Sequence, residues 1–336
     1  MLITDPASAP VFVSSDAARA VFRWEDAIKA LQATYARPMQ PSATPSRTIA
    51  SEEKSWLRVL PAIPPCGRYF GAKLMGMSVG APSPGVEYVI VLFDRQTSRI
   101  AAFVDGHLVT ALRTAATSAA ALDRLAPVGP VRLAVLGSGL ESSMHARAFA
   151  AVRTLVEVTV FSPTPERRSA FAESIKRDLG ISAKGVASAQ EAVEGADVVL
   201  AAARSRGEVP ILYGPWLEPR STVVSIGSTI PQQREIDVSV VERADLIVCD
   251  ALEEVLEQTG DMIAARAAGV AFHDKAFSLI DLMQGRCDER LALAKVPMFK
   301  SVGGGLQDIV VAELILTKAL EAGFAVPLPV AFETKH

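Results

Sequence analysis

The segment that most constrains the fold of this chain is residues 131–142, where an apolar run leads into Gly137-Ser138-Gly139 and then into a helical pattern. Gly137 permits a tight turn, and Gly139 lets the backbone approach a pyrophosphate seated on the helix N-terminus. Ser142 replaces the third glycine of the usual pattern and is small enough for close helix packing. The alternative is a tight turn without a ligand. The strand, turn and helix context favours a dinucleotide site at Gly137, Gly139 and Leu140.

Regular alternation after this segment indicates the fold class. Apolar runs at 156–161, 198–203, 222–226 and 246–249 are separated by helical stretches. Such spacing is typical of βαβ units and predicts an α/β fold with a Rossmann-type, doubly wound parallel sheet. Ser228 follows one of these strands, at the edge where ligands bind in such sheets.

The two ends of the chain have a different pattern. Residues 69–78, 86–94 and 100–104 are predicted strands, residues 15–35 and 114–125 predicted helices, and Asp105-Gly106 a predicted turn. The last helix, about 307–322, is expected to return to the first domain because the middle sheet is already complete. We therefore expect one α+β domain from residues 1–128 and 307–336, and a nucleotide-binding domain at 129–306.

The end of the second strand of the nucleotide domain bears on the choice of cofactor. An NAD site usually has a carboxylate there, which binds the ribose hydroxyls. Here Ser162 and Thr164 follow the strand, and Arg167 and Arg168 come next. These groups suit a 2′-phosphate, so NADP(H) is favoured and NAD(H) is the alternative. The two arginines could instead lie on a solvated helix start.

Composition excludes several other classes. A net charge of −3 argues against broad nucleic-acid binding, and there is no apolar run of about 18 residues to span a membrane. The three cysteines and four histidines are scattered, so neither a disulfide framework nor a metal site is expected. The first residues lack the pattern of a signal peptide, and a cytoplasmic protein with reduced cysteines is predicted.

Several motifs together resemble those of the ornithine cyclodeaminase and mu-crystallin family. The segment Leu112-Arg113-Thr-Ala-Ala-Thr-Ser-Ala, ahead of the nucleotide strand, resembles the family's substrate and cofactor signature. The remaining motifs fall in the family's order along nearly the whole chain: Phe103–Gly106, Pro41–Thr48, Leu60–Ala62, Ala72–Leu74, Gly227–Asp237 and Phe299–Gly303.

The resemblance implies an NAD(P)-dependent oxidoreductase acting on CH–NH or CH–NH2 groups. It also implies that the domain made from both chain ends binds the substrate and forms a homodimer, with the active site in the cleft beside the nucleotide domain. By match to the motifs, Arg47, Lys73 and Arg113 face the substrate. A guanidinium binds a carboxylate bidentately, and a lysine in a closed cationic pocket can exchange protons near neutral pH.

The same match gives further expectations for the cofactor. Thr114 and Thr117 are expected to face the nucleotide from the other domain. Lys300, Ser301 and Gly303 are expected near the nicotinamide. Other polar residues are given lesser roles: Glu235 and Asp237 as supporting residues, and His145 in packing or support.

Two departures from the family pattern bear on the activity. The cyclodeaminases have a catalytic aspartate where this chain has Thr229, and a glutamate where it has Arg58. Because both carboxylates are absent, the sequence favours reduction of a small α-imino acid, or oxidation of the matching amino acid, over cyclodeamination. Ornithine cyclodeaminase and a catalytically weak cofactor-binding protein are the alternatives. Arg58 also suggests a substrate with a second carboxylate, unless it is merely exposed to solvent.

Overall fold

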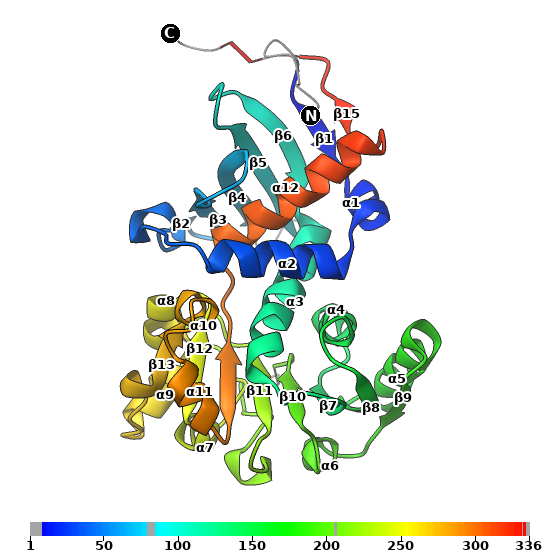
Figure 1. The fold of residues 1–336 in the computed structure, drawn as a ribbon, viewed down its shortest axis with the longest axis vertical. Helices are drawn as coiled ribbons and strands as arrows, with labels where there is room; N and C mark the ends of the chain where they lie inside the picture. Colours follow the sequence, from blue (N-terminus) through cyan, green and yellow to red (C-terminus); the bar gives the residue numbers. More distant parts are fainter. Residues whose placement is uncertain (1–8, 79–84, 205–206, 331, 334–336) are drawn as a thin grey trace. The chain divides into compact units, whose positions relative to one another are not determined.

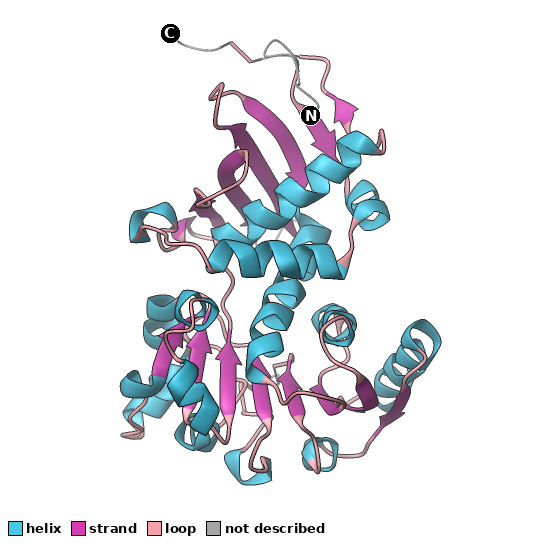
Figure 2. Ribbon diagram, in the orientation of Figure 1, coloured by secondary structure: helices cyan, strands magenta, loops and turns pink. Residues whose placement is uncertain are grey.

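The computed structural model describes residues 9–78, 85–204, 207–330 and 332–333, so the segment on which the signal-peptide interpretation rests lies outside the described residues. The chain divides into two compact units, unit 1 (Met1–Arg113 with Gly304–His336) and unit 2 (Thr114–Gly303). The division falls inside helix α3 (Gly106–Leu125), upstream of the expected change at 128–129. The predicted α/β class is confirmed (Figure 2).

Unit 1 is built on a seven-stranded sheet in the order β15-β1-β6-β5-β4-β3-β2. Strand β1 is parallel to β6, and the other neighbours are antiparallel. Helices α2 and α12 lie across one face of this sheet, and α12 contacts β4, β3 and β5 (Figure 1). The strands are β1 (Val11–Val13), β2 (Thr48–Glu52), β3 (Ser55–Ala62), β4 (Tyr69–Ser78), β5 (Val86–Asp94), β6 (Ile100–Asp105) and β15 (Val326–Pro327), and the helices are α1 (Ser15–Val21), α2 (Trp24–Tyr35), η1 (Pro41–Ala43) and α12 (Gly305–Glu321).

The sequence-based elements of unit 1 are largely confirmed, with two corrections. The single helix expected at 15–35 is two helices, α1 and α2, because Phe22 and Arg23 have extended backbones. Asp105-Gly106 is the start of α3 and not a turn: the Asp105 carboxylate accepts the His107 amide at 2.9 Å, so it serves as an N-cap.

Unit 2 is built on an eight-stranded sheet in the order β13-β12-β14-β11-β10-β7-β8-β9, and the neighbouring strands are parallel. Its central strands are buried and mostly apolar, as expected for a parallel sheet with helices on both faces. The strands are β7 (Val131–Leu136), β8 (Leu155–Phe161), β9 (Ser182–Gly185), β10 (Val198–Ala201), β11 (Thr222–Ser225), β12 (Leu246–Cys249), β13 (Ala276–Ser278) and β14 (Pro297–Lys300).

The helices of unit 2 lie between these strands along the chain. They are α4 (Leu140–Ala150), α5 (Pro165–Leu179), α6 (Ala189–Val193), η2 (Gly214–Trp216), α7 (Val238–Arg243), α8 (Leu252–Gln258), α9 (Gly260–Ala267), η3 (His273–Lys275), α10 (Leu279–Met283) and α11 (Asp288–Leu293).

The strand order of unit 2 contains a topological switch point. From β7 the chain passes outward to β8 and β9, and it then returns to place β10 on the other side of β7. In doubly wound sheets, ligands bind outside the carboxyl ends of the strands at such a point. The turn that holds Gly137 follows β7 and therefore lies at the expected place. Within the described residues, no helix is long and apolar enough to cross a membrane.

Candidate active site

Lys73 is the most unusual residue of the unit 1 sheet. It lies in the middle of β4, opposite Leu60 on β3 and Ile90 on β5, and only 1% of it is exposed. Both neighbours are buried and apolar, so an unpaired ammonium at this position would strongly destabilise the fold. Its Nζ atom lies 2.9 Å from the carboxylate of Asp308, a fully buried residue of α12.

Arg113 joins the same carboxylate. Its Nε donates to Asp308 Oδ1 at 2.9 Å, and one terminal nitrogen donates to Gln307 Oε1 at 2.8 Å. Gln307 in turn donates to the Tyr35 hydroxyl at 3.3 Å. Asp308 lies in the first turn of α12, where the helix dipole favours a negative charge. The cluster of Lys73, Arg113, Gln307 and Asp308 is called the unit 1 cluster below.

The start of α12 is held closely against β3. A Cβ atom on Gly305 would lie 2.6 Å from the carbonyl oxygens of both Leu60 and Pro61, so only glycine allows this approach. The close contact brings Asp308, three residues further on, against the strand beside Lys73. The position of the ion pair therefore depends on a backbone contact.

The surroundings of Lys73 change its acidity. The pKa of Lys73 is lowered to about 8, chiefly by burial and also by the positive charges of Arg113 and Arg47, while Asp308 opposes the shift. A lysine with this pKa holds its proton at neutral pH and releases it in mildly alkaline solution. It is therefore suited to proton exchange with a substrate nitrogen.

Two more arginines belong to this part of unit 1. Arg47 is half-buried and close enough to affect Lys73 electrostatically. Arg58 is half-buried on β3, opposite Met75, and shares the Lys73 face because Leu60 is opposite Lys73. Its guanidinium lies 5.4 Å from the centre of the Trp56 ring. The structure thus brings Lys73 and Arg113 together directly and places Arg58 on the same side of the sheet.

Asp308 and Gln307 were missed in the sequence. The signal was a pair of polar residues at the beginning of a helix whose next four residues, Ile309 to Ala312, are all apolar. Such a helix has to be buried on every side, so its polar residues need partners inside the protein. The sequence does not say which partners these are.

In unit 2, the glycine turn after β7 has the shape that a dinucleotide requires. Gly137 has φ +122°, and a Cβ atom there would lie 2.8 Å from the Ala202 carbonyl oxygen and 2.9 Å from Ser142 Oγ. Gly139 is the N-cap of α4 and provides no side-chain cap for the helix. The amides of an eleven-residue helix with no side-chain cap suit a pyrophosphate.

A cavity of about 210 Å³ adjoins this turn. Gly137, Ser162, Thr164 and Arg167 all line it, so the structure brings these predicted residues together. Arg168 has a different environment: it donates to the Ser162 carbonyl at 3.1 Å and lies against the Phe161 ring. Of the two arginines, Arg167 is the one that lines the cavity. These residues fit the adenosine end of a dinucleotide.

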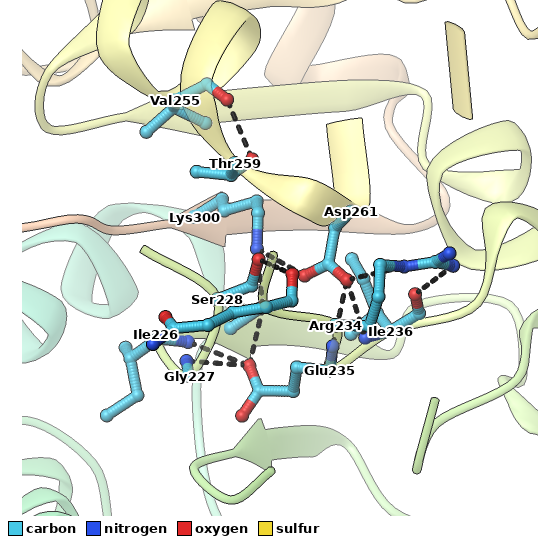
Figure 3. A network of polar contacts seen from close by, with 12 residues as sticks. Ile226, Gly227, Ser228, Arg234, Glu235, Ile236, Val255, Thr259, Asp261 and Lys300 are labelled. Carbon is cyan, nitrogen blue, oxygen red and sulfur yellow. Dashed lines mark hydrogen bonds and ion pairs between the residues drawn. The ribbon is translucent and has the colours of Figure 1, made fainter. Parts of the chain in front are cut away.

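The other predicted cofactor residues are engaged within unit 2. Ser228 donates to the Gln233 carbonyl at 2.6 Å, and the Ser301 hydroxyl donates to Asp250 at 2.7 Å. The Gly303 amide also donates to Asp250, at 2.9 Å. Lys300 is fully buried, and its ammonium donates to Asp261 (Figure 3). It also donates to the Ser225 hydroxyl. A cofactor contact by Lys300 would therefore involve its backbone, and the predicted contacts stay predictions.

Three more predicted residues, Thr114, Thr117 and His145, lie on helices α3 and α4. Thr114 and Thr117 belong to unit 2, the nucleotide unit itself, and not to the other domain as expected. His145 is buried in α4, with Nδ1 2.7 Å from the Glu141 carbonyl oxygen and Nε2 3.0 Å from Ser118 Oγ. Those contacts agree with the supporting role predicted for it.

Among the described residues, no group of three or more His, Cys, Asp or Glu side chains could hold a metal ion.

Comparison with known proteins first defines the class. The chain is similar in structure to the Delta(1)-pyrroline-2-carboxylate reductase of Thermococcus litoralis in complex with NADH and L-proline, at 26% identity and a TM-score of 0.83. That similarity covers 95% of this chain and 100% of the other. The fold is thus that of Rossmann-type reductases.

Sequence comparison then gives the family. The chain belongs to the ornithine cyclodeaminase/mu-crystallin family, whose model matches residues 12–323, as the motifs predicted. It is 30% identical to the ketimine reductase mu-crystallin of Rattus norvegicus over 91% of this chain and 96% of that protein. It is 32% identical to the iminosuccinate reductase of Paracoccus denitrificans over 70% of this chain and 72% of that protein. These relatives are named as reductases of imines, in agreement with the predicted enzyme class.

Proposed function

We propose that this protein is an NADP(H)-dependent oxidoreductase that reduces a small α-imino acid to the α-amino acid, or catalyses the reverse oxidation. The observation that carries the proposal is the unit 1 cluster, in which a buried lysine of lowered pKa shares one aspartate with an arginine. Relatives named as ketimine, pyrroline-carboxylate and iminosuccinate reductases support the reaction class.

The residues of unit 1 have complementary roles in this proposal. Arg113 and Arg47 bind the substrate carboxylate, because a guanidinium matches its geometry. Asp308 fixes one edge of Arg113 and keeps Lys73 protonated at neutral pH. Lys73 then donates a proton to the substrate nitrogen as the imine becomes an amine. In the reverse direction, the neutral lysine accepts that proton.

Unit 2 binds the cofactor in this proposal. When bound, the reduced nicotinamide supplies the hydride that adds to the imine carbon. The turn at Gly137 and Gly139 holds the pyrophosphate, and Arg167 binds the 2′-phosphate of NADP(H) with the hydroxyls of Ser162 and Thr164. The absence of a carboxylate at the end of β8 supports NADP(H) over NAD(H).

We also propose that the chain forms a homodimer through unit 1. Strand β2 lies at the edge of its sheet, and all five of its residues are exposed. Next to it, Leu57 on β3 is 45% exposed. An exposed edge strand with apolar neighbours is a surface that proteins usually cover. Light scattering of the purified protein measures its oligomeric state, and a monomer at micromolar concentration would contradict this part of the proposal.

A substrate panel tests the proposed reaction. Cyclic and linear α-imino acids are offered with NADPH or NADH, and the absorbance of the reduced nicotinamide is followed. We expect oxidation of NADPH with at least one imino acid, and a fall of about 100-fold or more in turnover for Lys73→Met. Proline and ammonia from ornithine without net cofactor turnover would indicate a cyclodeaminase instead. If neither the wild type nor Lys73→Met shows turnover, and both bind the cofactor and the imino acid equally well, the protein would be a binding protein.

A further inference from the structure

The strongest feature outside the unit 1 cluster is a buried carboxylate in unit 2, that of Glu235. Its exposed fraction is 0%, and it lies at the carboxyl-end edge of the sheet. One oxygen, Oε1, accepts the Ala203 amide at 2.9 Å. The other, Oε2, accepts the Gly227 amide at 2.9 Å and the Ile226 amide at 3.1 Å. One side chain therefore binds the backbone of two separate loops.

These two loops follow the neighbouring strands β10 and β11. The loop after β10 also packs against the glycine turn, since a Cβ on Gly137 would lie within 2.9 Å of the Ala202 carbonyl oxygen and the Ala203 Cβ, as well as of Ser142 Oγ. Ala203 lines the cavity beside that turn as well. Glu235 fixes the position of Ala203 by accepting the Ala203 amide. The position of Ala203 therefore determines the space beside Gly137.

A second set of contacts fixes Glu235 itself (Figure 3). Ser225 donates its hydroxyl to Glu235 at 2.8 Å and accepts a hydrogen bond from Lys300 at 3.0 Å. The Asp261 carboxylate accepts the Glu235 backbone amide at 2.8 Å and pairs with Lys300 at 2.8 Å. A Cβ on Gly227 would overlap the Glu235 carboxylate, so the loop after β11 packs directly on it.

Each of these partners of the Glu235 carboxylate donates a hydrogen bond to it. Three backbone amides and one hydroxyl point at its two oxygens and favour the ionised carboxylate over a neutral amide, while burial raises the pKa of Glu235 to about 7. A glutamine here would turn its NH2 group toward a backbone N–H on one side. Buried unsatisfied donors are costly, so at least one loop would have to move.

We infer that Glu235 is a positioning residue of the cofactor site, which holds the loops after β10 and β11 in the arrangement that accepts the dinucleotide beside the glycine turn. This inference rests on the proposed function. It explains the use of a buried carboxylate at the ligand-binding edge of the sheet, where the Ala203 and Gly227 amides lie beyond the ends of strands β10 and β11.

The test compares Glu235→Gln with a matched control, Asp245→Asn. The Asp245 carboxylate also accepts two backbone amides, those of Lys295 and Val296, at 2.7 and 3.1 Å. It does so at the opposite, amino end of strands β12 and β14. Dissociation constants for NADPH and NADH are measured by titration calorimetry, together with KM for the imino acid and the melting temperature.

We expect Glu235→Gln to raise Kd by about tenfold or more for whichever nucleotide the wild type binds more tightly. KM for the imino acid should change less than this Kd. Asp245→Asn should bind both nucleotides as the wild type does, whatever its melting temperature. Equal nucleotide affinity in Glu235→Gln and wild type would overturn the inference and leave the proposed function intact. Failure of the wild type to bind either nucleotide would overturn both.

A measurement on the wild type covers the case in which Glu235→Gln does not fold. Hydrogen exchange of the Ala203, Ile226 and Gly227 amides is followed with and without NADPH. Exchange at these amides should slow when the nucleotide binds, while exchange at Lys295 and Val296 should stay the same. If the nucleotide leaves all five amides unchanged, Glu235 does not position the cofactor site.

Discussion

Lys73 of unit 1 and Lys300 of unit 2 make an instructive comparison, because each is a buried lysine paired with an aspartate at 2.8 to 2.9 Å. Their surroundings differ in the balance of acidic and basic groups. Lys73 shares Asp308 with Arg113, so the cluster has two cations and one anion. Lys300 shares Asp261 with Arg234, and Glu235 lies beside them, so that network has as many acidic as basic groups, and backbone amides donate to its carboxylates. The first arrangement suits an anionic substrate, and the second holds the protein's own loops.

The largest effect should follow from Asp308→Asn, which removes the only acid in the unit 1 cluster. The buried cations lose their charged partner, so the free energy of unfolding should fall by about 3–5 kcal/mol. Imine reduction at pH 7 should fall by about 100-fold, because the pKa of Lys73 drops when the carboxylate that raises it is gone. Denaturant unfolding and steady-state kinetics measure the two effects.

Asp26→Asn is the control for this variant, since Asp26 forms a solvent-exposed pair with Lys318 in the same unit. It should change neither quantity appreciably. Wild-type kinetics in Asp308→Asn would show that the unit 1 cluster is only structural, as the network around Lys300 is, and the contrast between the two lysines would be lost.

The pH dependence of the wild type tests the same contrast without a mutation. The pKa of Lys73 is lowered to about 8, so the group is protonated below that pH and neutral above it. As the proton donor in reduction, it should keep kcat/KM level below about pH 7 and let it fall tenfold per pH unit above pH 8. Oxidation of the amino acid should show the reverse slope.

Lys73→Met should abolish the inflection near pH 8 in both directions. An inflection that survives in this variant would assign the proton transfer to another group.

A smaller effect is expected for Arg167→Ala in unit 2. Loss of a charged hydrogen bond to the 2′-phosphate should raise Kd for NADPH by about 10- to 100-fold and leave Kd for NADH within about twofold. Arg177→Ala is the control, because Arg177 lies on the same helix and is 71% exposed. An equal rise in Kd for both nucleotides would mean that Arg167 does not bind the 2′-phosphate.

The smallest effect is expected for Arg58→Ala. If Arg58 binds a second carboxylate, the preference for dicarboxylic over monocarboxylic imino acids should fall by about tenfold, the value of one weak ionic contact. Lys54→Ala, at the exposed turn between β2 and β3, should leave the preference unchanged. An unchanged preference in Arg58→Ala would eliminate the second-carboxylate hypothesis.

The sequence was sufficient to predict most of the fold. At each candidate site it also singled out residues that have a local signal, but not the distant residues that contact them. Strands 69–78 and 86–94 were found because alternating β-branched and aromatic residues are a local signal, and Lys73 was noticed because it interrupts one of them. The glycine turn and Arg167 were likewise local, since a strand, a turn and a helix start lie within a few residues of one another.

The partners of these residues could not be found in the same way. Asp308 lies 235 residues beyond Lys73, and no periodic pattern relates the two positions. Glu235 was assigned only a supporting role because its carboxylate binds backbone amides, which any sequence provides equally. The short strands β1, β9, β13 and β15 were missed because two to four residues show no alternation, whereas the four-residue strands β10, β11 and β12 were found as apolar runs between helical stretches.

The same separation has a consequence for biosynthesis. At roughly 5–20 residues per second, a ribosome needs on the order of ten to fifty seconds to make the chain between Lys73 and Asp308. Throughout that interval the strand bearing the lysine lacks both Asp308 and helix α12, and by the end of it the nucleotide domain has been synthesised. The nascent protein should therefore acquire its cofactor-binding half first, and its N-terminal sheet should need protection by chaperones until the last helix emerges.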